Sequence, residues 1–249
     1  MAAQVLMTRR ARHERRTAPI WRLFPKARGQ RVRRVCERLE ECYGKPRFGN
    51  PRDPLDDLIY VILSNKTHPP SATAAFRRLK QLFPTWHDAV AARARRMRSA
   101  LKPAGLSTIK TRQIRSALRQ VRADFGGYTL APLRRLSDSQ VEDYLVSLRG
   151  VSQKVAKCVM MYTMDRAVLP VDVHVHRVAS RLGWTMRKRA DQCHEELELL
   201  IPPKRRFAFH VGCIAHGRAC CRPRSPRCGT CCINRHCEYY RQIRPPDVR

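Results

Sequence analysis

The amino-acid sequence predicts an all-α fold, and three observations support this prediction. Apolar residues recur at helical spacing in most segments of the 249-residue chain. Signals that start and stop helices, such as Asp53 before Pro54 and glycines after apolar runs, separate these segments. The one alternating stretch, residues 171–176, has no evident partner strand. With 43% hydrophobic residues, the chain can bury the core of one large domain or of two smaller ones.

The N-terminal half is predicted to hold helices joined by short connections that Pro or Gly often marks. Asp53 is a helix cap and Pro54 a first-turn residue, so the apolar run that follows them is predicted to be a buried helix. The helices predicted in this half end before Gly44, span Leu55 to Leu63, run from a Ser71 cap to Pro84, and cover residues 86–101 and 108–122.

Two helices joined by a tight turn are predicted in the centre of the chain. Ser137 and Gln140 have the capping-box spacing for a helix with one apolar face. Gly150 ends this helix, and a second helix begins near Gln153. In such a helix-hairpin-helix, the turn amides and the positive end of the second helix suit a phosphate. An ordinary helix–helix turn has the same sequence signals.

Two residues near this hairpin could carry chemistry. Lys154 lies in the first turn of the second helix, where the helix dipole disfavours a cation, and a partly neutral lysine amine can attack a sugar carbon and form a Schiff base. Asp172 could stabilise positive charge on a sugar or assist proton transfer. The simpler roles are a surface lysine that touches a phosphate, and an N-cap for a helix from about Val173 to Leu182 that Gly183 ends.

Cysteines near the C-terminus have the spacing C-x6-C-x2-C-x5-C. The four residues in this pattern are Cys221, Cys228, Cys231 and Cys237. Thiolates crowded into one short, loop-rich segment can ligate a soft metal centre together, and the candidates are an iron–sulfur cluster and zinc. Cys220 and Cys232 are additional thiols beside these positions, so Cys220 could take the place of Cys221.

Basic residues dominate the charge of the chain. There are 51 Lys plus Arg against 20 Asp plus Glu, a formal charge of +31, which favours nucleic acid as a partner over a merely solvated Arg-rich surface. Ten basic residues and no acidic one lie between Arg93 and Arg122. Arg222, Arg224 and Arg227 lie inside the cysteine segment. These two places are the predicted contacts with phosphates.

The sequence also suggests a compartment. No stretch has the length of uncharged apolar residues that a membrane span needs, and residues 1–16 lack the apolar region of a secretion signal. We therefore expect a cytoplasmic protein, nucleoid-associated if bacterial, with reduced cysteines and no membrane partner. Residues 1–25 are expected to be a basic flexible arm, and the protein is expected to be a monomer.

Three motifs follow one another along the second half of the chain. They are Leu148-Arg149-Gly150-Val151-Ser152-Gln153-Lys154-Val155-Ala156, then Val171-Asp172-Val173-His174-Val175-His176-Arg177-Val178, and then His216-Gly217-Arg218 ahead of the cysteine pattern. In this order and spacing they resemble the endonuclease III family of DNA glycosylases, over roughly residues 31–239. The resemblance implies a two-lobed helix-hairpin-helix DNA glycosylase fold with a C-terminal iron–sulfur cluster loop. Residues 49–164 would form a helical barrel domain that ends in the hairpin, and residues 26–48 plus 165–249 a discontinuous helical iron–sulfur domain.

The same resemblance implies an enzyme of base excision repair. It would be a bifunctional DNA glycosylase and AP lyase that removes damaged bases, oxidised pyrimidines above all, and cleaves the abasic site by β-elimination. Lys154 and Asp172 match the catalytic lysine and aspartate of the family, and flipping the nucleotide out of the duplex gives the lysine access to C1′. The four cysteines would hold a [4Fe-4S] cluster with a chiefly structural role. The partner would be double-stranded DNA that contains damaged bases or abasic sites.

Further positions would contact this DNA. The contacts implied by the resemblance are Gly150 and Ser152 in the hairpin, Arg222, Arg224 and Arg227 in the cluster loop, Leu106 as an apolar wedge in the base stack, and Lys66 or Asn65 at the position of a glutamine that fills the space of the flipped base. A packed leucine after a helix-capping glycine is the alternative for Leu106.

Departures from the family pattern keep other functions open. The family hairpin is usually L-P-G-V-G-x-K, whereas Arg149 and Ser152 replace the proline and the second glycine here. Ser152 would cost about 1 kcal/mol if its position required a positive φ. Lys66 in place of the family's glutamine is a further difference. Together these differences leave two alternative functions open: a helix-hairpin-helix glycosylase for another lesion, uracil or an alkylated base, or a DNA-binding relative with weak or lost catalysis. His216 is interpreted as a structural histidine.

Overall fold

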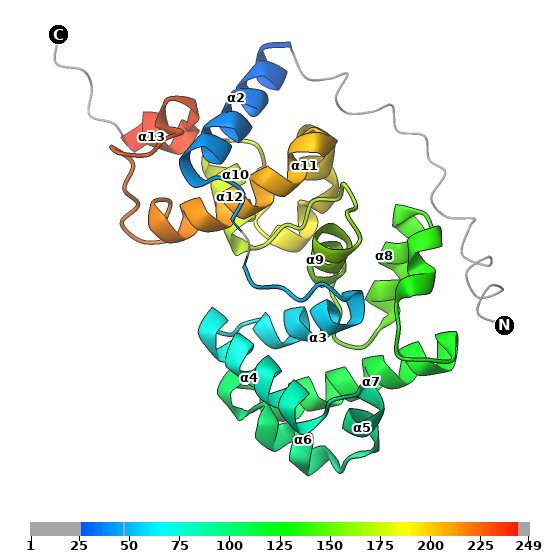
Figure 1. The fold of residues 1–249 in the computed structure, drawn as a ribbon. Helices are drawn as coiled ribbons and strands as arrows, with labels where there is room; N and C mark the ends of the chain where they lie inside the picture. The colour runs from blue at the N-terminus through cyan, green and yellow to red at the C-terminus, as the bar shows by residue number, and fades with distance from the viewer. Residues whose placement is uncertain (1–25, 47, 244–249) are drawn as a thin grey trace, which may run out of the picture. The chain divides into compact units, whose positions relative to one another are not determined.

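In a computed structural model, the described residues, 26–46 and 48–243, form helices and loops and contain no strand (Figure 1). The predicted all-α fold is therefore confirmed. The alternating stretch at residues 171–176 leads into a helix, α10 (Val173–Arg181), rather than a strand. None of the helices in the described ranges is long and apolar enough to span a lipid bilayer. The predicted arm, residues 1–25, lies outside the described residues.

The chain divides into two compact units. One comprises residues 49–166, and the other combines the described parts of residues 15–48 and 167–249. The second unit is discontinuous in sequence, because its first helix precedes the first unit and its other helices follow it.

The first unit is built around α3 (Pro54–Ser64). Its other helices are α4 (Pro69–Leu82), α5 (Trp86–Ala91), α6 (Ala94–Ala100), α7 (Ser107–Phe125), α8 (Asp138–Ser147) and α9 (Gln153–Thr163). Helix α3 packs against α4, α7 and α9, and Leu55, Leu58 and Leu63 on it are fully buried. The predicted buried helix over residues 55–63 is thus confirmed as the centre of this core.

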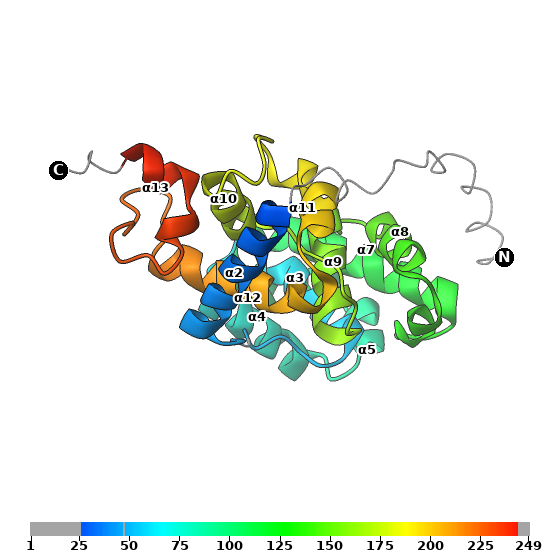
Figure 2. The same ribbon diagram turned by 90° about the horizontal axis from the view of Figure 1, so that it is seen from above.

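The second unit packs around α12 (Arg206–Ala219). This helix lies against both α2 (Lys26–Tyr43) and α10, and Figure 2 gives a second view of the contact between α12 and α2. Leu39 of α2 and Phe209 of α12 are fully buried in the shared core. Two shorter helices, α11 (His194–Leu200) and α13 (Glu238–Ile243), complete the described part of the unit.

Local capping signals explain several helix starts. The Asp53 carboxylate accepts hydrogen bonds from the amides of Leu55 and Asp56, both at 2.9 Å. Ser137 and Gln140 form the predicted capping box at the start of α8. These bonds satisfy amides that have no partner inside the helix, so the residue at the cap sets where the helix begins.

Two sequence predictions in the first unit were wrong. Ser71 is not a cap, because α4 begins two residues earlier at Pro69, after His68. Prolines fit the first turn of a helix, because backbone N–H groups there have no intrahelical acceptor and their absence in proline costs no hydrogen bond. The single helix expected over residues 86–101 is two helices, α5 and α6, and a capping box of Thr85 with Asp88 begins the first of them.

Candidate functional site

The hairpin predicted between α8 and α9 is present in the first unit. Helix α8 is followed by Leu148, and α9 begins directly after Ser152. Glu142 on α8 accepts a hydrogen bond from Gln153 Nε2 at 2.7 Å, and its carboxylate lies 3.4 Å from Lys157 Nζ. Bonds within the protein therefore fix how the second helix leaves the turn.

Gly150 and Ser152 differ in what the turn requires of them. Gly150 has a φ of 88°, and a Cβ placed on it would lie 2.5 Å from the Gln113 side chain, so both the backbone and the space favour glycine. Ser152 has φ −89° and ψ 166°, an extended conformation that any residue adopts. The expected cost of about 1 kcal/mol for serine therefore does not arise. Its side chain is exposed and makes no cap hydrogen bond to the first amides of α9.

Lys154 lies half-buried in the first turn of α9, and its charge acts on Asp57 of α3. Asp57 is fully buried. Burial raises its pKa to about 7, against the lowering effects of the Asn50 hydrogen bond and of the Lys154 charge. Asn50 Nδ2 donates to Asp57 Oδ1 at 2.6 Å, while Asp57 Oδ2 has no hydrogen-bond partner in the described part of the chain. Such a carboxylate can exchange a proton near neutral pH.

The two loop residues predicted to probe the DNA are both strained. Lys66, after α3, has a φ of 54°, and Leu106, before α7, has a φ of 49°. This left-handed conformation costs a residue with a Cβ about 1–2 kcal/mol. Both side chains are exposed, Leu106 to 54%. Leu106 is thus not the packed leucine of the alternative interpretation.

Asp172 lies in the second unit and caps α10. Its Oδ1 accepts hydrogen bonds from the amides of His174 at 2.9 Å and Val175 at 2.8 Å. Gly183, with a φ of 75°, follows the helix, so the helix predicted over residues 173–182 is confirmed to within one residue. The carboxylate is half-buried, and neither bond engages Oδ2. The capping role is observed, and the catalytic role stays a prediction.

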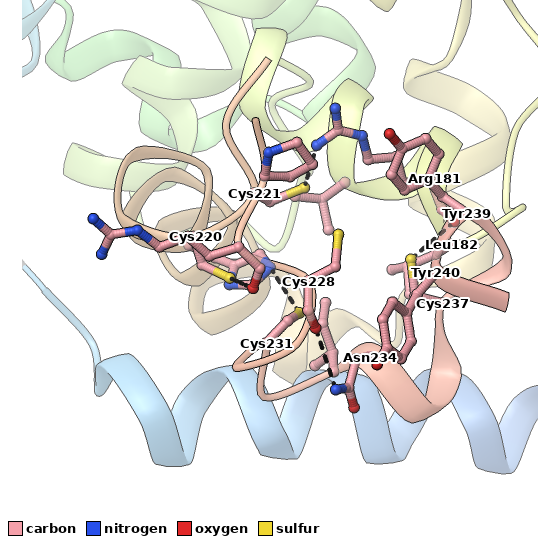
Figure 3. A pocket seen from close by; sticks show the side chains of 15 residues that line it. Arg181, Leu182, Cys220, Cys221, Cys228, Cys231, Asn234, Cys237, Tyr239 and Tyr240 are labelled. Carbon is pink, nitrogen blue, oxygen red and sulfur yellow. Dashed lines mark hydrogen bonds between the residues drawn. The ribbon is translucent and has the colours of Figure 1, made fainter. Parts of the chain in front are cut away.

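The four predicted cysteine ligands line one cavity of the second unit (Figure 3). They are Cys221, Cys228, Cys231 and Cys237. Arg181 Nη1 donates to Cys221 Sγ at 3.2 Å, and Cys237 Sγ donates to the Arg181 carbonyl at 3.2 Å. Cys220 also lines the cavity, but its thiol donates to the Arg227 carbonyl at 3.2 Å. Because the Cys220 thiol is engaged by a backbone carbonyl, these contacts support Cys221 over Cys220 as a ligand.

Cys231 also lies close to two residues outside the predicted ligand set. The ligand atoms of His216, Cys220 and Cys231 all lie within 4.8 Å of one another. His216 Nε2 is 3.6 Å from Cys231 Sγ, and the Tyr43 hydroxyl is 2.9 Å from Nδ1. Burial, followed by the charge of Arg177, lowers the His216 pKa to about 4, which keeps the imidazole neutral.

These two arrangements fit different metal centres. The group of one imidazole and two thiols is compact enough for one soft ion such as zinc. Sulfurs that hold a multi-iron cluster must lie further apart, because irons and bridging sulfides stand between them. Four thiols spread around one cavity therefore fit a [4Fe-4S] cluster in donor type and in arrangement.

The basic loop between Cys221 and Cys228 is exposed as predicted. Arg222, Arg224 and Arg227 have exposed side chains. Arg181 supports the loop by donating to the carbonyls of Arg222 at 2.8 Å and Pro223 at 3.1 Å. The loop backbone is therefore held while the three guanidinium groups stay accessible to an anion.

The basic region between residues 93 and 122 is less uniform than predicted. Lys110 is only 3% exposed, and Arg115 is half-buried and donates to the carbonyls of Ala89 and Ala92. The expectation that this whole region faces phosphates is wrong for these two residues, because each uses its charge inside the first unit. The remaining eight basic residues there are exposed.

Three buried charged residues of the described ranges, Asp57, Lys110 and Lys157, were not predicted from the sequence, and the first two show why. Asp57 stands within the apolar run from Leu55 to Leu63, and Lys110 lies at helical spacing from the buried Ile114 and Val121. The available signal in both cases was a charged residue on the apolar face of a helix. That signal alone does not tell a buried charge from one that reaches solvent at the edge of the face.

Comparisons with known proteins agree with this fold and these motifs. Residues 59–203, more than half of the chain, match the model of the HhH-GPD superfamily base excision DNA repair protein. Endonuclease III of Thermotoga maritima is 29% identical over 204 residues, which cover 82% of this chain and 92% of that protein. A solved non-covalent endonuclease III–DNA complex has a TM-score of 0.75 at 24% identity, covering 86% of this chain and 97% of that chain. A thermostable thymine-DNA glycosylase has a TM-score of 0.74 at 20% identity, covering 87% and 99%.

Proposed function

Because this chain belongs to the HhH-GPD superfamily of base excision DNA repair proteins, we propose that it is a bifunctional DNA glycosylase and AP lyase for oxidised pyrimidines in duplex DNA. The glycosylase class follows from the family. The lyase step and the choice of lesion are the parts that the proposal adds, and each rests on particular residues.

The observation that carries the lyase step is Lys154 at the start of α9, directly after the hairpin. A lysine here has the nucleophile that an abasic-site lyase needs, since an amine can form a Schiff base with a sugar aldehyde. Lys154 is half-buried, and the nearby Asp57, whose pKa burial raises to about 7, is a group that can accept a proton near neutral pH.

The proposed reaction begins with a nucleotide flipped out of the duplex. The lone pair of Lys154 Nζ forms a bond to C1′ while the bond from C1′ to the base breaks, and the base leaves with that electron pair and takes up a proton. The nitrogen then loses one proton, its lone pair forms the second bond to C1′ while the C1′–O4′ bond breaks, and O4′ takes up a proton, which leaves a protonated imine between Nζ and C1′. Removal of a proton from C2′ then lets the C3′–O bond break, so that the 3′ phosphate leaves. Asp172 is proposed to stabilise the positive charge on the sugar and to assist proton transfer.

The proposed DNA contacts are exposed, and all except the apolar Leu106 offer positive charge or backbone amides. Ser152 makes no side-chain cap at the start of α9, and the positive end of this helix is proposed to bind a phosphate beside Gly150. Arg222, Arg224 and Arg227 are proposed to bind further phosphates. Leu106 is proposed to enter the base stack, and Lys66 to occupy the space of the flipped base.

The proposed cofactor is a [4Fe-4S] cluster held by Cys221, Cys228, Cys231 and Cys237. The support is the fit of four thiols around one cavity, together with the Arg181 contacts to two of them. When bound, such a cluster would cross-link the segment and so hold the basic loop of residues 222–227 in place. The reacting groups, Lys154 and Asp172, are supplied by the chain itself.

A second candidate is a glycosylase for a different lesion. Lys66 stands where the family has a glutamine, and its ammonium would offer hydrogen-bond donors without an acceptor to the strand opposite the lesion. A likeness of fold to a thymine-DNA glycosylase is compatible with this alternative. A panel of duplexes with oxidised pyrimidines, uracil, mismatched thymine and alkylated purines separates the two candidates by which base is released.

The test of the lyase proposal is covalent trapping with borohydride on duplex DNA that holds an abasic site. The wild-type protein is expected to form a stable adduct, and Lys154→Ala is expected to form none. Lys188→Ala, which removes an exposed lysine of the second unit, is the control and should trap like the wild type. Undiminished trapping by Lys154→Ala would overturn the assignment of the nucleophile.

A further inference from the structure

Lys110 is a buried cation with a complete set of hydrogen-bond acceptors. Its Nζ donates to the carbonyl of Leu63 at 2.6 Å, to the carbonyl of Ala104 at 3.0 Å and to the hydroxyl of Thr67. An ammonium group has three donors, and these three acceptors match them in number. All three acceptors are neutral groups, so within the described residues the charge is held by hydrogen bonds rather than by an ion pair.

The three acceptors come from two parts of the first unit that are far apart in sequence. Leu63 lies in the last turn of α3, and Thr67 lies in the connection between α3 and α4, which contains Lys66. Ala104 lies in the connection between α6 and α7, which contains Leu106. Thr67 Oγ1 also donates to the Ala104 carbonyl at 2.7 Å, so the two loops are bonded to each other as well as to Lys110.

Each of these loops carries one strained, exposed residue. Lys66 and Leu106 both have a positive φ without being glycine, and both side chains are exposed. Strain of this kind persists where the surrounding structure fixes the backbone and is characteristic of functional positions. Exposure adds a second unfavourable feature at Leu106, because a leucine side chain gains nothing from solvent. The bonds from Lys110 and Thr67 provide the fixed surroundings for both residues.

The charge at position 110 is not what packing alone would select. Lys110 lies on the apolar face of α7 with Ile114 and Val121. Burial of an ammonium group is unfavourable, and it lowers the Lys110 pKa here. A methionine would fill a similar volume without that cost. Methionine cannot donate the three hydrogen bonds that Lys110 makes to Leu63, Thr67 and Ala104. These bonds therefore explain why a lysine stands at this position.

We propose that Lys110 is a positioning residue for nucleotide extrusion, which holds the Lys66 and Leu106 loops in one fixed arrangement so that both side chains meet the DNA together. This proposal rests on the proposed function, since it assigns a step that precedes the chemistry at Lys154. Lys110 itself is buried and does not touch the DNA. Its removal should hinder opening of the base stack and leave the reaction of an already abasic sugar nearly intact.

The experiment compares two duplexes, one with a paired oxidised pyrimidine and one with a preformed abasic site. Lys110→Met should lower single-turnover excision of the paired base by about tenfold to a hundredfold, as expected for misplaced binding groups. Borohydride trapping on the abasic duplex should change less than about threefold. Equal losses on both duplexes would overturn the proposal, because they would indicate a general structural effect.

Arg115→Met is the matched control. Arg115 lies on the same helix and also donates to two carbonyls, but those carbonyls belong to Ala89 and Ala92, away from the two loops. Arg115→Met should not reduce excision of the paired base more than trapping on the abasic duplex. Thr67→Val removes the shared hydroxyl with little change of shape, and it should give a smaller loss in the same direction if Lys110→Met fails to fold. Loss of selectivity in Thr67→Val, with excision and trapping reduced alike, would also count against the proposal.

A double-mutant comparison tests whether Lys110 acts through Leu106. If it does, Lys110→Met should cause little further loss in a Leu106→Ala background. Fully additive losses would overturn this link.

A readout that needs no catalysis uses the Lys154→Ala protein and 2-aminopurine at the extrusion position, where Lys110→Met should reduce the fluorescence gained on binding. If no lesion is excised by the wild type, the proposed function fails, whereas the fluorescence result still decides the role of Lys110.

Discussion

The hairpin and the cysteine segment are held by different means. Between α8 and α9, Glu142 contacts side chains of both helices, and Gly150 forms the turn with a positive φ. In the cysteine segment, residues 220–237, backbone turns and Arg181 bring thiols around a cavity, and Asn234–His236 forms a short 3-10 helix. The hairpin is thus fixed by contacts between its own side chains and by the conformation of one glycine, whereas the thiols of the cysteine segment surround a cavity.

The largest effect is expected when a proposed cluster ligand in the cysteine segment is replaced, because the hairpin should then stay folded while the cluster is lost. Cys228→Ser and Cys221→Ser should lose the cluster and several kcal/mol of folding free energy, because metal binding contributes to folding. Iron analysis should give about four irons per wild-type chain and far less for either variant. Circular dichroism should show most of the helical signal retained, as expected if the helices of the first unit, residues 49–166, stay folded.

The control for this experiment is Cys220→Ser, which alters the neighbouring thiol. It should keep its iron, since the Cys220 thiol donates to the Arg227 carbonyl. The opposite pattern, iron lost from Cys220→Ser and kept by Cys221→Ser, would exchange the two ligands. Zinc retained by Cys228→Ser and lost from Cys220→Ser would instead indicate a single ion at His216, Cys220 and Cys231.

The next largest effect concerns the first unit, where the buried Asp57 should make the free energy of unfolding depend on pH. The folded pKa of Asp57, about 7, lies above the ordinary value of 3.8, so the folded chain binds more protons and its stability falls as pH rises between these values. Asp57→Asn removes this dependence while keeping an acceptor for Asn50. The stability gain over the wild type should grow to about 4 kcal/mol above pH 7. Urea unfolding at several pH values measures it, with the exposed Asp143→Asn as control. Parallel curves for the wild type and Asp57→Asn would contradict the burial argument.

A smaller effect tests the hairpin turn itself. Gly150→Ala should destabilise the protein by about 1–2 kcal/mol through its positive φ, and should weaken duplex binding further by displacing Gln113. Gly127→Ala is the control, because its φ is ordinary and nothing lies within 4 Å of the added Cβ. Adding Gln113→Ala to Gly150→Ala should restore part of the loss. If Gly150→Ala has the stability and affinity of the wild type, the close approach is unimportant.

The smallest effect per residue concerns the basic cluster loop. Replacing Arg222, Arg224 and Arg227 by Ala should weaken duplex binding for all sequences alike. The slope of log affinity against log salt should decrease by about 0.9 for each phosphate that the variant no longer neutralises. Arg235→Ala, an exposed arginine of the same segment, is the control. An unchanged salt slope in the triple variant would remove this loop from the proposed DNA interface.

Features with local causes were predictable from the sequence. The cap at Asp53, the capping box at Ser137, the hairpin at Gly150 and the helix after Asp172 each depend on a few neighbouring residues. The motifs in this order also identified the family. Sequence and structure agree most closely where one residue satisfies the amides next to it.

Features with tertiary causes were not predictable in the same way. Whether Asp57 and Lys110 are buried depends on which elements cover their helices, and spacing along one helix does not contain that information. The proximity of His216 to Cys231 likewise results from the packing of the cysteine segment on α12. The start of α4 at Pro69 shows a competition between two signals, in which the proline pair prevailed over Ser71.

Lys154 of the first unit is proposed to be the nucleophile. To identify the nucleophile directly, the protein is trapped on abasic DNA with borohydride, the adduct is digested, and the modified residue is located by mass spectrometry. The sugar remnant is expected on Lys154. A remnant on another lysine, such as Lys66 or Lys157, or on the N-terminal amine would contradict it.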